Sequence, residues 1–198
     1  MQVVTTSPLI KRYTLEEFWT LPEPADGSKL ELIAGVLYKT PMPGFRHNLS
    51  QSSLGRFFSC YRAERGDQGI LFFPRAALCT SSNTHLEPDL FYLSADLVRK
   101  SNPEKLESAD IAVEVISPET AIYERNTKAD TYAALGVREL WLVDPDNETV
   151  GIRSLTPGAK RYSAERVFNR GKQIESNVWP DFLLPVSNIF DAVPRKTK

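Results

Sequence analysis

The sequence predicts a single α/β domain in which helices flank a mixed central β-sheet. The chain has 198 residues, of which 41% are hydrophobic and 25% are charged, and this is the composition of one soluble domain with a hydrophobic core. A strand, a helix and a strand are expected in that order between residues 111 and 143, which implies parallel pairing through a right-handed crossover. An antiparallel hairpin is expected at 29–40. We therefore expect one domain over residues 13–192, with loose termini at 1–12 and 193–198.

The first elements are predicted by local signals. Residues 14–17, Thr-Leu-Glu-Glu, have the form of a capping box, which predicts a short helix ending near Leu21. Two apolar-rich runs at 29–33 and 36–40 are separated by Ala34-Gly35, which indicates a hairpin of two strands.

A longer helix and three strands are expected in the middle of the chain. Apolar residues recur at intervals of three and four from 47 to 65, and Gly66 closes this predicted helix. Strands are expected at 69–79 and 89–93, with a turn at Ser81-Ser82-Asn83. The segment 111–116 is almost wholly apolar, which is typical of a strand covered on both faces and predicts the centre of the sheet.

The last third is expected to complete the sheet. A helix is predicted from 119 to 135, ended by Gly136, and a strand follows at 138–143. Short β-like pieces alternate with turns from 148 to 184, and a last helix is expected at 187–192.

Charge and cysteine content restrict the partners and the environment. Lys and Arg total 24 against 25 acidic residues, so no general basic field attracts nucleic acid or a membrane, and an anionic partner must be held locally. The two cysteines, Cys60 and Cys79, are too few for a disulfide framework, which predicts a reduced, cytoplasmic protein. No signal peptide and no run of about 18 apolar residues is found, so neither export nor a membrane span is expected.

Three carboxylates stand in or beside predicted strands. Glu114 lies in the middle of a buried strand, where an unpaired charge is very costly. Asp89 begins another strand and Glu31 lies inside a third, so the three could converge as oxygen ligands for Mg²⁺. A structural ion pair at Glu114 and a capping role for Asp89 are the alternatives. Glu87 is expected to be an exposed neighbour that points to the other face.

Lys128 is expected on the helix that follows the Glu114 strand. Glu124 and Tyr132 lie four residues to either side on the same helical face. A solvated ion pair is the ordinary interpretation of this spacing. If the helix packs over the strand end, the ammonium instead faces the carboxylates, and a metal beside a lysine suits phosphodiester hydrolysis. We expect Glu31, Asp89, Glu114 and Lys128 in one cavity.

The ordered set of these segments resembles the PD-(D/E)XK nuclease superfamily, and more closely a family of small bacterial restriction-endonuclease-like proteins common in photosynthetic bacteria. The resemblance extends over nearly the whole chain and implies a restriction-endonuclease-like fold. Its segments are Leu30-Glu31-Leu32-Ile33-Ala34-Gly35, Glu87-Pro88-Asp89-Leu90, Val113-Glu114-Val115-Ile116-Ser117-Pro118, Glu124-Arg125-Asn126-Thr127-Lys128 and Gly136-Val137-Arg138-Glu139-Leu140-Trp141-Leu142-Val143-Asp144-Pro145.

The resemblance also implies roles for these residues. Asp89 and Glu114 bind Mg²⁺ or Mn²⁺, Glu31 assists them, and Lys128 serves the attacking water and the scissile phosphate. Ile116 stands where the superfamily has its lysine, and Lys128 matches a lysine that this family carries on the next helix. Ala34 and Glu124 stand where the family commonly has aspartate.

The resemblance implies an endonuclease that cleaves nucleic acid, most simply DNA. Duplex cleavage needs two sites, so a homodimer is expected. His47, Ser117 and Tyr132 are candidate substrate-binding residues, although His47 could be a satisfied histidine and Ser117 a helix cap. The rival is a catalytically inactive nucleic-acid-binding or regulatory protein that retains the fold, which the net charge of −1 favours.

Two other kinds of site are disfavoured. Cys60, Cys79, His47 and His85 lack the paired spacing of zinc ligands. Ser117 and Lys128 lack the nucleophile elbow of a serine hydrolase.

Overall fold

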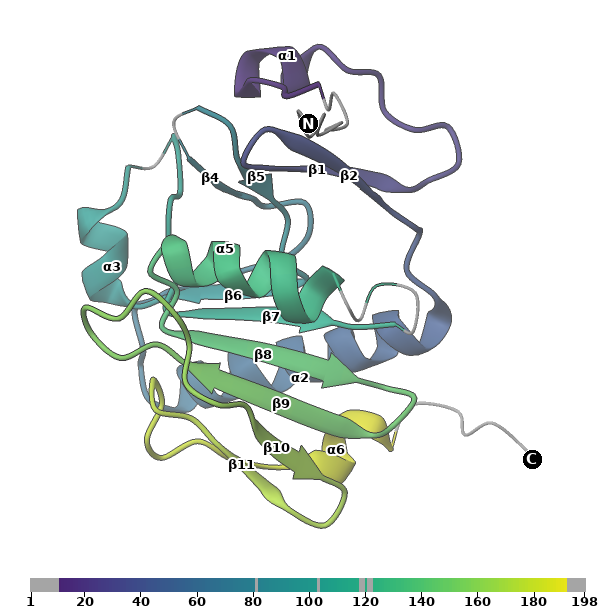
Figure 1. Ribbon diagram of the computed structural model, residues 1–198. Coiled ribbons are helices and arrows are strands. Elements are labelled where there is room, and N and C mark those ends of the chain that lie inside the picture. Colours follow the sequence, from purple (N-terminus) through teal and green to yellow (C-terminus); the bar gives the residue numbers. More distant parts are fainter. Residues whose placement is uncertain (1–10, 81, 103, 118–119, 121–122, 192–198) are drawn as a thin grey trace, which may run out of the picture.

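A six-stranded mixed sheet with helices on both faces forms the body of the protein, and a smaller four-stranded sheet lies beside it (Figure 1). The computed structural model describes residues 11–80, 82–102, 104–117, 120 and 123–191. The helices are α1 (Leu15–Trp19), α2 (Phe45–Glu64), α3 (Ala95–Lys100), the π-helical turn η1 (Glu124–Lys128), α5 (Ala129–Ala134) and α6 (Val186–Phe190). The strands are β1 (Lys29–Ile33), β2 (Val36–Thr40), β3 (Ile70–Phe72), β4 (Leu78–Cys79), β5 (His85–Leu86), β6 (Leu90–Leu93), β7 (Ile111–Val115), β8 (Glu139–Asp144), β9 (Thr149–Ser154), β10 (Arg166–Asn169), β11 (Gln173–Glu175) and β12 (Leu183–Pro185).

The central sheet has the strand order β10-β9-β8-β7-β6-β3. Strands β7 and β8 are parallel, with Glu114 opposite Leu142, and the other neighbours are antiparallel. The sheet is therefore mixed and β7 lies at its centre, as the apolar run at 111–116 predicts.

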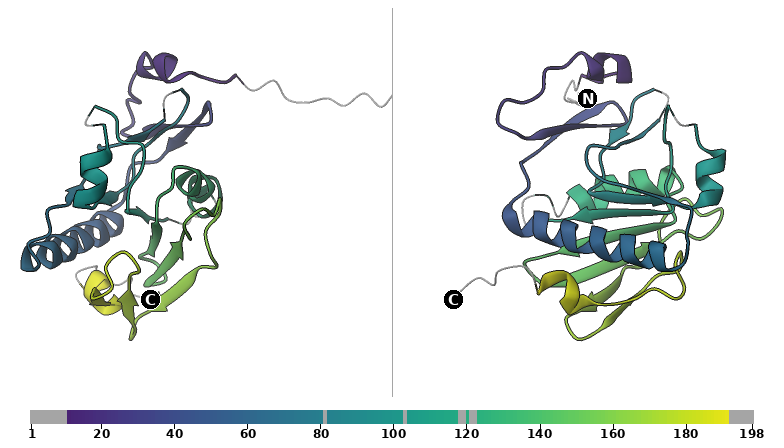
Figure 2. Two further views of the ribbon diagram at one scale, coloured as in Figure 1. Left: turned by 90° about the vertical axis from the view of Figure 1, so that its left-hand side faces the viewer. Right: turned by 180° about the vertical axis from the view of Figure 1, so that it is seen from behind.

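Alternating side chains of β7 build two cores, one on each face of the sheet. Val113 and Val115 pack on the side covered by α2 and α6, whereas Ala112 packs on the side covered by α5. Figure 2 shows α2 lying along one face and α5 along the opposite face. Glu114 has the parity of Ala112, so its carboxylate belongs to the α5 face.

The small sheet carries the N-terminal elements, in the order β2-β1-β5-β4. The predicted hairpin is present, and its turn residues Ala34 and Gly35 have φ values of 48° and 82°, the positive φ pair of a type I′ turn. The predicted capping box is also present, because Thr14 and Glu17 each accept a hydrogen bond from the other's backbone N–H.

The prediction of one strand over 69–79 is wrong. Strand β3 pairs with β6 in the central sheet, whereas β4 pairs with β5 in the small sheet. Pro74 lies between them and has no N–H to donate to a strand ladder, so the chain leaves one sheet there and enters the other. Ser81 of the predicted turn lies outside the described residues.

The single helix predicted over 119–135 is also corrected. The described part is a π-helical turn, η1, followed by α5, and residues 118, 119, 121 and 122 lie outside the described residues. A π-turn is wider than an α-turn, a difference that apolar spacing does not reveal. The termini predicted to be loose lie outside the description at 1–10 and 192–198, so the structure describes only Lys11 and Arg12 of them. Within the described chain, every helix is too short or too polar to cross a bilayer.

Candidate active site

A cleft of about 930 Å³ opens where the hairpin, the start of α2 and the carboxyl end of β7 meet. Its polar lining comes from several elements that are distant in sequence. The charged and polar side chains that line it include Lys29, Arg46, His47, Gln51, Arg75, Glu87, Asp89, Glu114, Ser117 and Glu124.

Asp89 stands immediately before β6 and is held there by backbone and side-chain contacts. Its Oδ2 accepts a hydrogen bond from the Val115 N–H at 2.7 Å and pairs with His47 Nε2 at 3.1 Å. Burial raises the pKa of Asp89, but His47, Lys29 and the Val115 N–H together outweigh burial and lower it. The carboxylate is therefore ionised at neutral pH. Both contacts use Oδ2, so Oδ1 takes part in neither of them.

Glu114 lies beside it on β7 and is almost completely buried. Its Oε1 accepts a hydrogen bond from the Tyr132 hydroxyl and pairs with Lys128 Nζ at 2.6 Å. Burial raises the pKa of Glu114, and the negative charges of Asp89 and Glu31 raise it further, against the attraction of Lys128 and Lys29. A cation in the cleft would relieve this repulsion.

Lys128 is fully buried at the end of η1 and does not line the cleft. Its ammonium lies 2.6 Å from Glu114, 3.2 Å from Glu31 and 3.3 Å from Glu124. Burial lowers the pKa of Lys128, but the carboxylates of Glu114, Glu124 and Glu31 hold it well above its usual value. Lys128 is thus a permanent cation behind the cleft wall.

Glu31 lies behind the wall with Lys128 and is fully buried. Its Oε1 accepts a hydrogen bond from the Glu87 backbone N–H at 3.0 Å, and Lys29 Nζ lies 3.7 Å away. Burial raises the pKa of Glu31, yet the nearby cations, above all Lys128, lower it overall. Its Oε2 is buried without a hydrogen-bond donor among the described residues.

The structure adds two residues that the sequence did not single out for the site. Glu124 lines the cleft, and burial together with the charge of Glu114 raises its pKa well above the usual value. Lys29 also lines the cleft and donates to the Glu87 carbonyl at 2.7 Å. The four-residue spacing of Glu124 and Lys128 was the available signal for Glu124. No local pattern marked Lys29.

Of the other residues considered from the sequence, some line the cleft and some are buried beside the acids or the small sheet. His47 lines the cleft and contacts Asp89, and Ser117 lines the cleft with its hydroxyl 3.3 Å from Thr120 Oγ1. Tyr132 is fully buried beside Glu114, away from the cleft wall. The expectation that Glu87 is exposed is wrong, because Glu87 directly follows β5 of the small sheet and its buried carboxylate lies against His85.

The carboxylates offer two ligands for a cation. In the described part of the chain, no three His, Cys, Asp or Glu side chains are arranged to hold a metal ion, so the set of Asp89, Glu114 and Glu31 does not converge as such. Asp89 and Glu114 nevertheless line the cleft from adjacent strands, each with one oxygen outside the contacts given above. Mg²⁺ is commonly bound by one or two carboxylates, with water and substrate phosphate completing its shell, and these two residues fit it.

A mixed sheet flanked by helices is the fold of a restriction-endonuclease-like protein. Over residues 15–187 the sequence matches the Uma2 family, described as "Putative restriction endonuclease", and the chain belongs to that family. Among solved structures, it is similar to a putative nuclease belonging to DUF820 from Anabaena variabilis ATCC 29413. That similarity has a TM-score of 0.72 and 19% identity, and covers 90% of this chain and 98% of the other. No curated protein matches the chain.

Proposed function

We propose that the protein is a Mg²⁺-dependent endonuclease that hydrolyses phosphodiester bonds of DNA. The observation that carries the proposal is the pair of buried carboxylates, Asp89 and Glu114, which line one cleft from adjacent strands. Membership of the restriction-endonuclease family supports the reaction class. Mn²⁺ is expected to replace Mg²⁺, because both prefer oxygen ligands.

Asp89 and Glu114 would hold the cation through Oδ1 and Oε2. When bound, the cation supplies Lewis-acid activation of the phosphate and of the attacking water. The protein holds the two ligands in place: His47 and the Val115 N–H fix Asp89, while Tyr132 and Lys128 fix Glu114. Lys128 is therefore a positioning residue in this proposal, which acts through Glu114 rather than on the substrate.

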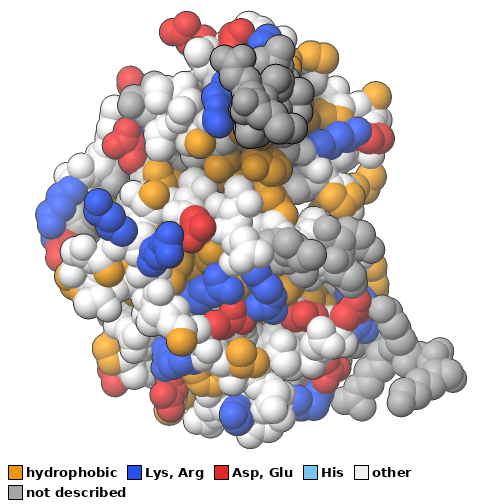
Figure 3. Space-filling model, in the orientation of Figure 1, with side chains coloured by type: hydrophobic (Ala, Val, Ile, Leu, Met, Phe, Trp, Pro, Cys, Tyr) orange, Lys and Arg blue, Asp and Glu red, His pale blue; other side chains and the backbone are white. Residues whose placement is uncertain are grey.

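The cleft also carries groups that suit a phosphate backbone. Lys29 and His47 line it beside the acids, and Gln51 reaches in from α2. Elsewhere the charges are mixed, and Figure 3 shows Lys and Arg side chains interspersed with Asp and Glu over the face drawn there. We therefore expect the cleft, rather than a broad basic surface, to provide most of the affinity for DNA.

A catalytically inactive nucleic-acid-binding protein is the second candidate. One observation favours it: the Lys128 ammonium is enclosed by three carboxylates and is absent from the cleft wall. In that case the cleft binds nucleic acid without cleaving it.

Cation binding and cleavage should be measured together on the same variants. Asp89→Asn and Glu114→Gln keep the side-chain shape, and each should lower cleavage of plasmid and single-stranded DNA by about 100-fold or more in Mg²⁺ or Mn²⁺. Calorimetric titration should show that both variants also lose affinity for the cation. Glu175→Gln, on the exposed part of β11, is the matched control and should behave as wild type.

Two results would decide against the nuclease. If wild type binds DNA but does not cleave it with either cation, the binding protein is the better account. If Asp89→Asn binds Mg²⁺ as wild type does, the proposed ligand set is incorrect.

A further inference from the structure

A second cluster of reactive side chains lies in the small sheet, where β4 and β5 pair. Cys79 stands opposite His85 in the antiparallel register. The Cys79 sulfur lies 3.1 Å from His85 Nδ1, and His85 Nε2 lies 3.2 Å from Glu87 Oε1. A thiol, an imidazole and a carboxylate therefore form one continuous chain of hydrogen bonds, the arrangement that activates a cysteine as a nucleophile.

The imidazole of His85 also packs against two aromatic rings. The Phe18 and Trp19 rings lie 4.9 and 4.7 Å from it, centroid to centroid, and only 5% of its side chain is exposed. Burial lowers the pKa of His85, but its contacts with Cys79 and Glu87 outweigh burial and raise the pKa to about 9. At neutral pH both ring nitrogens therefore carry protons and donate, one toward sulfur and one toward Glu87.

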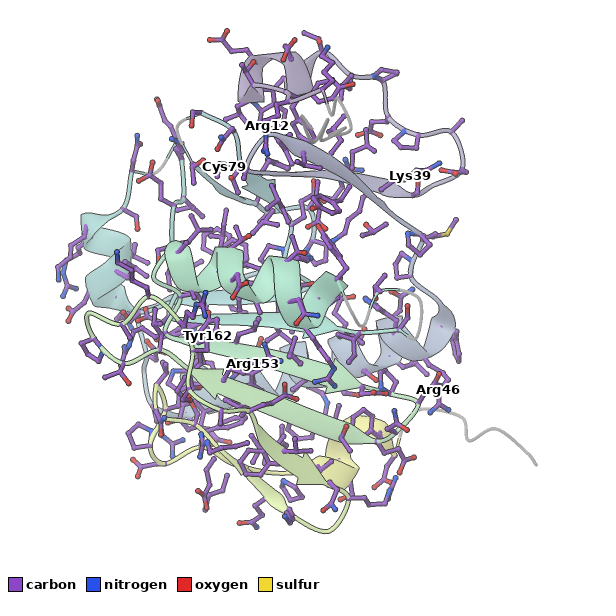
Figure 4. All side chains as sticks on the ribbon, in the orientation of Figure 1. Arg12, Lys39, Arg46, Cys79, Arg153 and Tyr162 are labelled. Carbon is purple, nitrogen blue, oxygen red and sulfur yellow. The ribbon has the colours of Figure 1, made fainter. Side chains whose placement is uncertain are left out.

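Cys79 itself remains accessible to small reagents. It is partly exposed, on a strand of the small sheet that Figure 4 shows at a distance from Arg46 at the cleft. It does not line the cleft. Partly exposed cysteines next to a cationic group are the ones that react.

Cys60 provides an internal comparison. It is exposed on α2, but the chain has only two histidines, and the other one, His47, pairs with Asp89. Exposure alone would make Cys60 the more reactive thiol. The histidine contact would reverse that order.

We propose that Cys79 is an oxidative modification site that reacts with hydroperoxides, with His85 as its proton donor. As a thiolate, the Cys79 sulfur attacks one peroxide oxygen, an S–O bond forms and the O–O bond breaks. Sulfur is oxidised by two electrons to a sulfenic acid and the peroxide is reduced. The departing hydroxide, or alkoxide from an organic hydroperoxide, takes the Nδ1 proton of His85 and leaves as water or an alcohol.

The cluster also adjoins the candidate active site. Glu87 accepts a hydrogen bond from Lys29 through its carbonyl, donates its N–H to Glu31, and precedes Asp89 by two residues. Only the side chains of His85 and Glu87 therefore separate Cys79 from the segment that carries Asp89, the proposed cation ligand. The thiol chemistry itself does not depend on nuclease activity.

The test compares the two cysteines within one molecule. Purified full-length protein is treated with limiting hydrogen peroxide in the presence of dimedone, and the labelled peptides are quantified by mass spectrometry. Cys79 should be labelled at least about ten-fold faster than Cys60. His85→Gln should remove that advantage, and Cys60→Ser should leave the rate at Cys79 unchanged. Circular dichroism monitors folding of each variant.

The wild-type ratio decides the proposal even if His85→Gln does not fold. Labelling of Cys79 no faster than that of Cys60 would overturn it. Unchanged labelling of Cys79 in a folded His85→Gln variant would overturn the role given to His85. Iodoacetamide alkylation of the same samples should give the same order of rates, because it uses the same nucleophile.

Discussion

Replacing Lys128 by methionine removes the cation that lies closest to three buried carboxylates and puts an unbranched apolar side chain of similar length in its place. Glu31, Glu114 and Glu124 would then be buried without the ammonium that now lies within 3.3 Å of each. Removing one partner of a buried ion pair costs about 3–5 kcal/mol. For a chain of this size, each kcal/mol lowers Tm by about 2–4 °C, so we expect a loss of about 6–20 °C at pH 7.5.

The pH dependence of this loss distinguishes an electrostatic cause from a packing defect. In wild type the pKa of Glu31 is below its usual 4.5, so Glu31 contributes stability that is present above pH 4.5 and is lost as pH falls through the lowered value. Without Lys128 that contribution disappears, and the buried carboxylates accept protons more readily. The difference in the free energy of unfolding between wild type and Lys128→Met should therefore be largest near pH 8 and shrink as the pH approaches 4.5.

Urea unfolding followed by tryptophan fluorescence measures the free energy directly, because Trp141 and Trp179 are buried. Lys160→Met, at an exposed position, is the matched control and should change the free energy of unfolding by less than about 0.5 kcal/mol. A deficit below about 1 kcal/mol for Lys128→Met would refute the reasoning. So would a deficit that stays constant between pH 5 and pH 8.

Four further outcomes are expected. Tyr132→Phe should lower the free energy of unfolding by about 1–2 kcal/mol in thermal melts, because it removes the hydroxyl that donates to Glu114. Glu124→Gln should be more stable than wild type in alkaline buffer, since the contribution of Glu124 is lost as pH rises through its raised pKa; equal alkaline stability would contradict this. Wild type should lose stability between pH 6.5 and about 9 as His85 loses its proton, and urea titrations of His85→Gln should not show that loss. Light scattering at micromolar concentration should give the mass of a homodimer, and a monomer mass would count against paired active sites.

Local signals in the sequence were sufficient for much of the fold. The capping box at Thr14, the hairpin turn at Ala34-Gly35 and the parallel pair β7 and β8 depend on neighbouring residues or on one crossover, and all three are confirmed. The break between β3 and β4 was missed because it depends on which distant strand each half pairs with. No periodicity within 69–79 contains that information.

In the candidate site, too, some residues could be predicted from local sequence and others could not. Sequence alone could select Glu31, Asp89 and Glu114. A carboxylate within or beside an apolar strand is expected to be buried, and a buried carboxylate without a partner costs free energy. The partners themselves were harder to predict. Lys29 reaches Glu87 across strands that lie far apart in sequence, and the burial of Glu87 depends on β5 joining the small sheet.

The parity of β7 explains why the cation closest to Glu114 comes from the helix that covers one face of the sheet. Ala112, Glu114 and Ile116 share the face covered by α5, and the neighbours of Glu114 on its own strand are apolar. The closest compensating charge on that face is Lys128, which lies at the end of η1, the element packed over it. Glu124 and Lys128, at the two ends of η1, are both buried and lie 3.3 Å apart. Lys128 pairs with Glu114 of β7, and the backbone N–H of Val115 on the same strand donates a hydrogen bond to Asp89. Strand β7 therefore sets the positions of both carboxylates that line the cleft.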